Sequence, residues 1–349
     1  MKKLTQLILA LLTFFNCAVM TGQDKSEKSN RLIFRAAFYN VENLFDTIDD
    51  PQKDDAEFLP GSRIAWNSQR YYTKIDHLSE VIAALGGDQP AAIIGLCEVE
   101  NELVTGDLIH SSKLLPFGYS AIQFNSPDER GIENVLIYDE DQFRPVFFRP
   151  IRVDISSFNS DQTRDILYVK GYCPKAKKDT LHIFINHWPS RSEGKEVSEP
   201  KRMVAAQTLK HVTDSLMTLP SHPLILIMGD LNDEPSDKSI SEGLGALAPT
   251  GGFDPAKLYN LGYPPYQQGK GTLYYKDWDL FDQMIVNGAF LLNTKGLTII
   301  EPEENIFSPD WLLYKSNDGT SRPNRTAAKD YYGGYSDHLP VYLDMIIRK

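Results

Sequence analysis

Apolar residues along the chain fall into many short runs and two longer segments with helical spacing. Helical spacing predicts helices over 72–85 and 201–217, and Gly86 and Gly87 end the first of them. The polar stretch 46–68 predicts a loop. Short apolar runs predict strands over residues 32–39, 91–99, 135–138, 147–155, 166–172, 181–186, 224–228, 281–286, 290–300 and 340–347. Many strands with few helices between them predict one α+β domain with sheets packed together.

The N-terminal segment MKKLTQLILALLTFFNCAVMTG has the layout of a secretory signal peptide. Lys2 and Lys3 precede a short apolar run, and smaller residues follow it. The predicted organisation is a signal peptide over 1–22, a polar linker over 23–31 and a domain over 32–349. The alternative is a lipoprotein that keeps an acylated Cys17. Both alternatives predict export to the periplasm or to the extracellular space. No later apolar run in the sequence reaches the ~18 residues that a membrane span needs.

The composition is that of an ordinary globular protein, with 42% hydrophobic and 24% charged residues, which excludes a disordered chain. Lys and Arg number 36 against 47 Asp and Glu, so the formal net charge is −11. This charge excludes nucleic-acid binding driven by bulk positive charge. Cys97 lies in an apolar run and is expected to be a buried, unpaired thiol.

Polar residues follow the predicted strands repeatedly. The segments that carry them are YNVENLFD (39–46), GLCEVEN (95–101), INHWPSR (185–191), GDLNDEP (229–235), WDLFDQMIV (278–286) and YSDHLPVYL (335–343). Carboxylates and amides brought by several strand ends to one rim make an oxygen-rich pocket. Such ligands suit Mg²⁺, with Mn²⁺ or Ca²⁺ as alternatives, better than Zn²⁺. Each segment alone is also ordinary turn or cap chemistry.

These segments, together with DERGI (128–132) and in this order, resemble the endonuclease/exonuclease/phosphatase superfamily over residues 32–347. That family includes pancreatic-type deoxyribonucleases, abasic-site endonucleases, inositol polyphosphate phosphatases and bacterial sphingomyelinases. GDLN and SDHLPV are the most specific parts of the resemblance. It implies a four-layer α/β/β/α sandwich, with a metal-dependent site for phosphoric esters where the two sheets meet.

The resemblance also implies metal ligands. Glu98 matches the family's metal-binding Glu, and Asn40 matches an Asn on the metal or phosphate side. Asp337 matches an Asp near the metal. Glu42 matches an acidic position that supports the metal in some members, and a surface acid is the alternative there. The ordinary alternative for Asn40 is a turn-forming residue.

Five further residues match catalytic positions of the family. Asp230 would position or deprotonate the attacking water, and Asn232, on the same face of an extended chain, would bind the phosphate. His338 would lie against the scissile phosphate, as a base or as a cation, and Asp282 would fix its tautomer. His187 would assist the leaving oxygen, or would simply pack beside its neighbour in the sequence.

Three residues are candidate substrate contacts. Arg130 and Arg191 could clamp phosphate oxygens, because guanidinium pairs bidentately with phosphate, with plain surface charge as the alternative. Tyr335, in the segment YYGGY, could stack on a base or sugar, with loop packing as the alternative.

The first function hypothesis is an exported nuclease or phosphodiesterase with a phosphodiester substrate. We expect it to be a monomer without a stable protein partner. The alternatives with the same chemistry are a phosphatase or a phospholipase-C-like enzyme on inositol phosphates or sphingomyelin-type lipids. An alternative of a different class is a non-catalytic protein that binds a phosphate ligand.

Overall fold

The structure is a computed structural model that describes residues 33–87, 89–158, 162–176, 179–317 and 319–349. The predicted signal peptide (1–22), the linker (23–31) and Cys17 lie outside the described residues. Among the helices that are described, none has both the length and the apolar character needed to cross a membrane. Cys97 and Cys173 are buried free thiols, as expected for Cys97.

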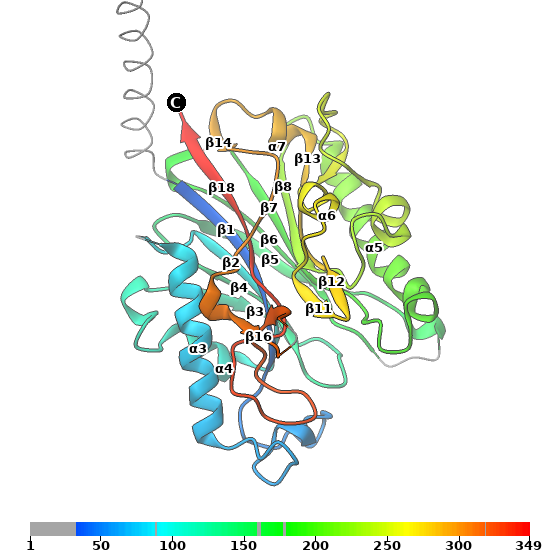
Figure 1. The fold of residues 1–349 in the computed structure, drawn as a ribbon. Helices are drawn as coiled ribbons and strands as arrows, with labels where there is room; N and C mark the ends of the chain where they lie inside the picture. Colours follow the sequence, from blue (N-terminus) through cyan, green and yellow to red (C-terminus); the bar gives the residue numbers. More distant parts are fainter. Residues whose placement is uncertain (1–32, 88, 159–161, 177–178, 318) are drawn as a thin grey trace, which may run out of the picture. The chain divides into compact units, whose positions relative to one another are not determined.

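Two mixed seven-stranded sheets form the centre of the domain (Figure 1). The first sheet is ordered β14 (Gly296–Ile299), β18 (Val341–Arg348), β1 (Ile33–Leu44), β2 (Ile93–Val99), β4 (Glu133–Tyr138) and β3 (Ser120–Gln123), with β15 (Asn305–Ile306) beside β18. The second is ordered β5 (Arg144–Ile151), β6 (Ile166–Tyr172), β7 (Leu181–His187), β8 (Leu224–Asp230), β13 (Asp282–Asn287), β10 (Leu258–Asn260) and β9 (Ala246–Leu247). Strand β1 is parallel to β2, and β7 is parallel to β8.

The two sheets pack face to face through side chains that alternate along the strands. Phe38 of β1 enters the same buried cluster as Ile185 of β7 and Met228 of β8. Its neighbour Tyr39 points to the opposite face of the first sheet, as the period of two requires. The sheets approach closely at Gly95, where an added Cβ would lie 2.8 Å from Ile185 Cδ1. A larger residue at this position would push the two sheets apart.

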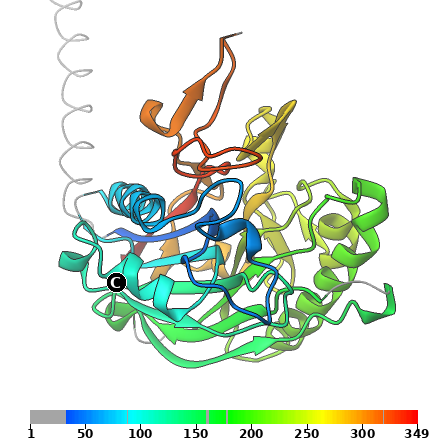
Figure 2. The same cartoon turned by 90° about the horizontal axis from the view of Figure 1, so that it is seen from below.

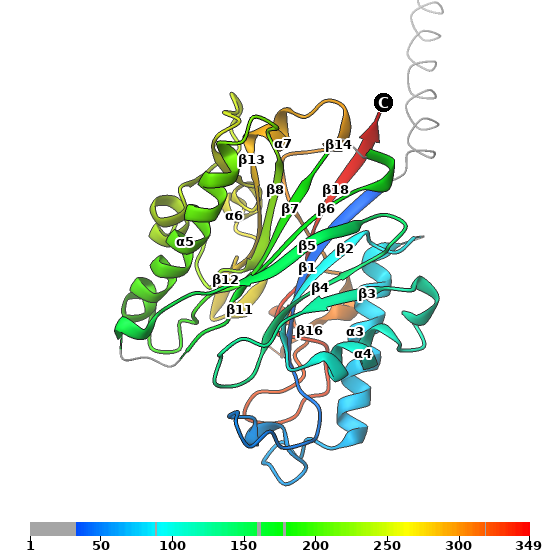
Figure 3. The ribbon, with the colours of Figure 1, turned by 180° about the vertical axis from the view of Figure 1, so that it is seen from behind.

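Helices cover the outer face of each sheet, so the predicted four-layer α/β/β/α sandwich is confirmed (Figures 1 and 3). The helices are α3 (Ser68–Gly86), α4 (Glu102–Ile109), α5 (Lys195–Met217), α6 (Tyr263–Gln267) and α7 (Gly288–Leu292). Helix α3 begins after Asn67, whose side chain accepts a hydrogen bond from the Arg70 amide. Its residues Ile75 and Leu78 pack on the first sheet, whereas Leu209 of α5 packs on the second.

Two small hairpins stand beside the edges of the sheets. They are β11 (Leu273–Tyr275) with β12 (Asp277–Asp279), and β16 (Leu313–Lys315) with β17 (Ser321–Pro323). Figure 2 shows both hairpins projecting on one side of the sandwich, and β11 lies against β17. Neither hairpin is predicted from apolar periodicity, because their strands have only three residues each.

Other observed elements also differ from the predicted ones. The strand predicted over 290–300 is wrong in its first half, since helix α7 occupies Gly288–Leu292 and only Gly296–Ile299 is extended. A short apolar run does not distinguish a helix from a strand. Strand β3 and helix α4 were not predicted, and α5 begins six residues early with Pro200 inside its first turns. Pro200 is the sixth residue of α5, so its missing amide removes one hydrogen bond from the second turn of the helix.

Candidate active site

Six buried or nearly buried polar side chains meet where strands of both sheets end. We call them the strand-end cluster: Asn40, Glu98, His187, Asp230, Asp282 and His338. Parallel pairing brings the carboxyl ends of neighbouring strands to one edge. The register places His187 of β7 directly beside Asp230 of β8, and Asp230 beside Asp282 at the start of the antiparallel β13.

Asn40 lies at the centre of the cluster. Its Nδ2 atom is 3.0 Å from Asp230 Oδ2, 3.2 Å from Glu98 Oε1 and 3.5 Å from His338 Nε2. His187 Nε2 is 3.7 Å from both Glu98 Oε1 and Asp230 Oδ2. The structure therefore brings together residues that the sequence predicted as metal ligands and residues that it predicted as catalytic.

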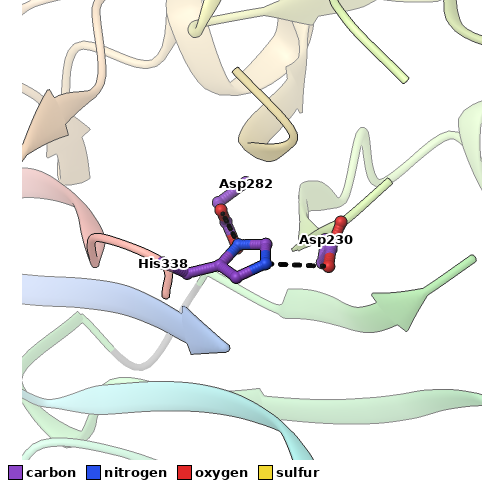
Figure 4. A group of neighbouring side chains, drawn as sticks. All are labelled: Asp230, Asp282 and His338. Carbon is purple, nitrogen blue, oxygen red and sulfur yellow. Dashed lines mark hydrogen bonds and ion pairs between the residues drawn. The ribbon is translucent and has the colours of Figure 1, made fainter. Parts of the chain in front are cut away.

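Asp282 and His338 form a buried pair within this cluster (Figure 4). Asp282 Oδ2 is 2.7 Å from His338 Nδ1, and His338 Nε2 faces Asp230 Oδ2 at 3.8 Å. Burial by itself would lower the pKa of His338, but the charge and hydrogen bond of Asp282 raise this pKa well above its usual value. The imidazole of His338 is therefore held as a cation that points at Asp230.

His187 has the opposite protonation. Burial lowers its pKa well below the usual value, and the positive charges of Arg164 and Arg130 add to the effect. Its buried Nδ1 atom has no hydrogen-bond partner among the residues that the structure describes. Burial also raises the pKa of Asp230, to about 6, with Asp282 contributing and His338 opposing. One neutral imidazole, one imidazolium and a carboxylate that titrates near neutrality thus share one site.

The backbone is strained at two residues of this region. Glu98 has φ of +63° and Asn232 has φ of +50°, in the left-handed region that residues other than glycine rarely adopt. The Asn232 amide nitrogen of the backbone donates to Asp230 Oδ1, and its side chain donates to the Trp188 carbonyl. Strained non-glycine residues concentrate at functional sites, where the surrounding packing holds them in place.

Two predicted metal ligands, Glu42 and Asp337, belong to a second group. We call it the charge network: Glu42, Lys74, Arg325 and Asp337. Arg325 lies 2.9 Å from Glu42 Oε1 and 3.0 Å from Asp337 Oδ2. Glu42 Oε2 accepts a 2.6 Å hydrogen bond from the Thr326 amide, so both of its oxygens are in use. Burial raises the pKa of Glu42 to about 7. These contacts fasten the segment 325–337 to Glu42 of β1, and the metal role of Glu42 and Asp337 stays a prediction.

The three predicted substrate contacts have different surroundings. The guanidinium of Arg191 binds Asp233 at 2.8 Å and Asp237 at 2.5 Å, so its charge is already compensated. Tyr335 stacks on His77 with ring centroids 4.7 Å apart, away from the strand-end cluster. Arg130 is exposed and its guanidinium donates to Asn43 Oδ1, and its charge reaches His187. Arg130 alone retains a cation that is free for a phosphate.

Sequence reasoning missed two buried cations near the site. Arg164 is 8% exposed, lies 3.2 Å from Asp128 and donates to the Trp188 carbonyl, next to His187. Lys74 is 1% exposed and donates to Thr326 Oγ1. Arg164 lies far from the DERGI segment in the sequence, so that motif does not point to it. Lys74 lies among apolar positions of α3. A cation at an apolar helical position was the one available signal.

The strand-end cluster fits a hard divalent cation. Glu98 and Asp230 present carboxylate oxygens on either side of the Asn40 amide. Among the described residues, Asp230, Asp282 and His338 also bring one ligand atom each within 4.8 Å of one another. Because His338 Nδ1 is hydrogen-bonded to Asp282, we interpret this pair as one that keeps His338 protonated rather than as a pair of metal ligands. The carboxylate oxygens of Glu98 and Asp230 suit a hard divalent cation, and Asn40 faces them with Nδ2, a hydrogen-bond donor that orients both carboxylates.

Comparisons with known proteins agree with this geometry. A family model described as the endonuclease/exonuclease/phosphatase family matches residues 35–347. No curated protein matches the sequence. Similar folds include Bacteroides thetaiotaomicron mannosyl-6-phosphatase (15% identity, TM-score 0.55, covering 90% of this chain and 100% of that one). The fold is also similar to truncated Caenorhabditis elegans TDP2, with 13% identity and a TM-score of 0.55 over 90% of this chain and 98% of that one. It is similar to the human Nocturnin catalytic domain, with 16% identity and a TM-score of 0.53 over 90% of this chain and 95% of that one.

Proposed function

The chain belongs to the endonuclease/exonuclease/phosphatase family, a family of phosphoesterases, and from this premise we propose an exported, divalent-metal-dependent phosphodiesterase that acts on nucleic acid. The observation that carries the proposal is the strand-end cluster. It combines carboxylates for a divalent ion, a carboxylate with a pKa of about 6 and an imidazolium within one buried site. The signal-peptide layout of residues 1–22 supports export.

Hydrolysis of a phosphodiester needs positive charge for the phosphate oxygens, a proton acceptor for the attacking water and a donor for the leaving oxygen. A divalent ion held by the carboxylates of Glu98 and Asp230 would supply part of the positive charge. Asp230 is placed to accept the proton of water, because a carboxylate with a pKa near 6 is ionised at neutral pH yet still basic.

His338 supports the reaction as a cation in this proposal. The carboxylate of Asp282 holds it protonated and orients Nε2 toward the centre of the cluster. It would hydrogen-bond a phosphate oxygen and stabilise the charge that develops there. His187 is neutral and lies against Glu98 and Asp230, from where its Nε2–H can hydrogen-bond the leaving oxygen. His338, as the imidazolium, can supply the proton that the leaving oxygen takes up when the P–O bond breaks.

A phosphomonoesterase is the second candidate. The net charge of −11 disfavours a long polyanion and favours a small phosphate ester. A similar fold carries the name mannosyl-6-phosphatase, which describes such a monoester for that protein. Sequence identity of 15% leaves the substrate of this chain to experiment.

The test is a substrate panel with Mg²⁺, Mn²⁺ or Ca²⁺, each compared with a chelator. We expect hydrolysis of bis-p-nitrophenyl phosphate and of DNA or RNA, and little of p-nitrophenyl phosphate. Asp230→Asn should abolish it, whereas the exposed Asp141→Asn is the matched control and should not. Activity confined to monoesters would overturn the nuclease proposal in favour of the phosphatase, and activity in chelator would overturn the metal dependence.

A further inference from the structure

A pocket of about 540 Å³ is lined by residues of both projecting hairpins. Hairpin β11–β12 contributes Tyr274 and Tyr275, and hairpin β16–β17 contributes Tyr314 and Arg322. The segment before β18 contributes Tyr332. This volume is within the usual range for sites that enclose a small ligand.

The aromatic rings at this pocket are unusually exposed. Tyr275 is 72% exposed, Tyr332 is 59% and Tyr314 is 46%. Tyr274 is held edge-on by Trp278, with ring centroids 5.5 Å apart. Exposed aromatic groups that gather at one place on a soluble protein commonly mark a binding surface. The flat faces of these rings suit a planar partner.

The charge of the pocket is opposite to that of the whole chain. Arg322 and Arg325 line it, with Asp337 as the only carboxylate among its described lining residues. Asp337 already accepts a hydrogen bond from Arg325 at 3.0 Å. Arg322 lies 5.2 Å above the Tyr314 ring centroid, which is a cation–π arrangement. Because Glu42 and Asp337 compensate Arg325, the net positive charge of the pocket comes from Arg322, in a chain of net charge −11.

The pocket is joined directly to the strand-end cluster. Leu273 of β11 lines the pocket and forms an isolated antiparallel bridge with His338. The Leu339 amide donates to the Thr272 carbonyl at 2.7 Å, which fastens the hairpin to the segment that carries His338. Asp337 lines the pocket and precedes His338 in the chain. The pocket therefore lies beside the chain segment that carries His338.

We propose that this pocket binds an unpaired nucleobase of the nucleotide whose phosphate lies at the strand-end cluster, with Tyr314 and Tyr274 as stacking surfaces. The inference rests on the proposed function and names its substrate class. Stacking on tyrosine needs a free face of the base, which pairing within a duplex hides.

The first test measures binding by calorimetry in a chelator, so that no turnover occurs. The probes are thymidine 5′-monophosphate, deoxyribose 5-phosphate, which lacks only the base, and mannose 6-phosphate. We expect thymidine 5′-monophosphate to bind about 5- to 100-fold more tightly than deoxyribose 5-phosphate, the range that stacking of one base supplies. Equal binding of these two probes, or tighter binding of mannose 6-phosphate, would overturn the proposal.

The second test uses variants in the same assay. Tyr314→Ala and Tyr274→Ala should lose the preference for the base, Tyr314→Phe should retain it, and Tyr72→Ala is the control because Tyr72 is 58% exposed on helix α3. A preference that survives both alanine variants would overturn the proposal. In hydrolysis, the KM for single-stranded oligonucleotides should be below the KM for the duplex. Tyr314→Ala should raise the KM for single strands and leave the KM for the duplex unchanged.

These outcomes separate the pocket from the proposed function. Base-dependent binding without hydrolysis of any diester would retain the pocket and contradict the phosphodiesterase. Hydrolysis of diesters without any dependence on the base would retain the phosphodiesterase and contradict the pocket.

Discussion

The strand-end cluster and the charge network are neighbouring groups of buried ionisable side chains that are balanced differently. The network sets two carboxylates, Glu42 and Asp337, against two cations, Lys74 and Arg325. The cluster contains three carboxylates, and His338 is the only imidazole among its members that is held protonated. Buried charges are costly unless they are paired. The charge network, whose charges are balanced, therefore fixes the segment 325–337. The strand-end cluster has an excess of carboxylates, which fits the proposed divalent cation.

The largest expected effect separates the two groups by activity. Asp230→Asn removes the proposed proton acceptor and a metal ligand, and should lower kcat by about 10²- to 10⁴-fold. Removing one uncompensated buried charge should leave the free energy of unfolding unchanged or raised. Rates on bis-p-nitrophenyl phosphate and urea unfolding measure both. A full rate in this variant would contradict the role of Asp230.

The next effect is one of stability. Glu42→Gln leaves Lys74 and Arg325 facing Asp337 alone, and should lower the free energy of unfolding by about 3 kcal/mol, as breaking a buried pair does. Urea unfolding followed by circular dichroism gives the value. If this variant instead retains its stability and loses metal binding, Glu42 is a metal ligand and the distinction between the two groups fails.

Metal binding should stabilise the protein through the cluster alone. At a Mg²⁺ or Mn²⁺ concentration about 100 times its Kd, the free energy of unfolding should rise by about 2.7 kcal/mol, because the ion binds the folded state. Thermal unfolding with and without a chelator measures this change. Glu98→Gln should remove it, whereas Glu140→Gln, at an exposed position, should not. An equal response in both variants would contradict a site at the strand ends.

The smallest expected effect concerns a buried histidine, His182, that has no carboxylate partner among the described residues. Burial lowers the pKa of His182, which bonds Tyr168 and has no acidic partner, to about 4. Between pH 6.5 and 4 the unfolded chain therefore binds more protons, and stability falls as the pH falls. From pH 8 to pH 6 the loss is about 0.8 kcal/mol. His182→Gln should reduce this slope in urea unfolding, and NMR titration should find His338 protonated where His182 is neutral.

Much of the fold could be predicted because its signals are local. Alternating apolar residues in the central strands and the helical spacing of 72–85 each specify a buried face without reference to the rest of the chain. The run 290–300 was misassigned because a short apolar stretch fits a helix or a strand equally well. The hairpins of the pocket, with strands of three residues, have no period long enough to detect.

The sequence by itself determined that polar residues end the strands and that they have the residue types of a phosphoesterase site. Only the tertiary structure decided which of them meet. It joined Glu98 of the first sheet to Asp230 of the second through Asn40, placed His338 against Asp230, and bound Glu42 and Asp337 to Arg325. Charge balance depends on every group within a few ångströms. Residues far apart in the chain supply those groups, so no local sequence pattern can predict the charge balance.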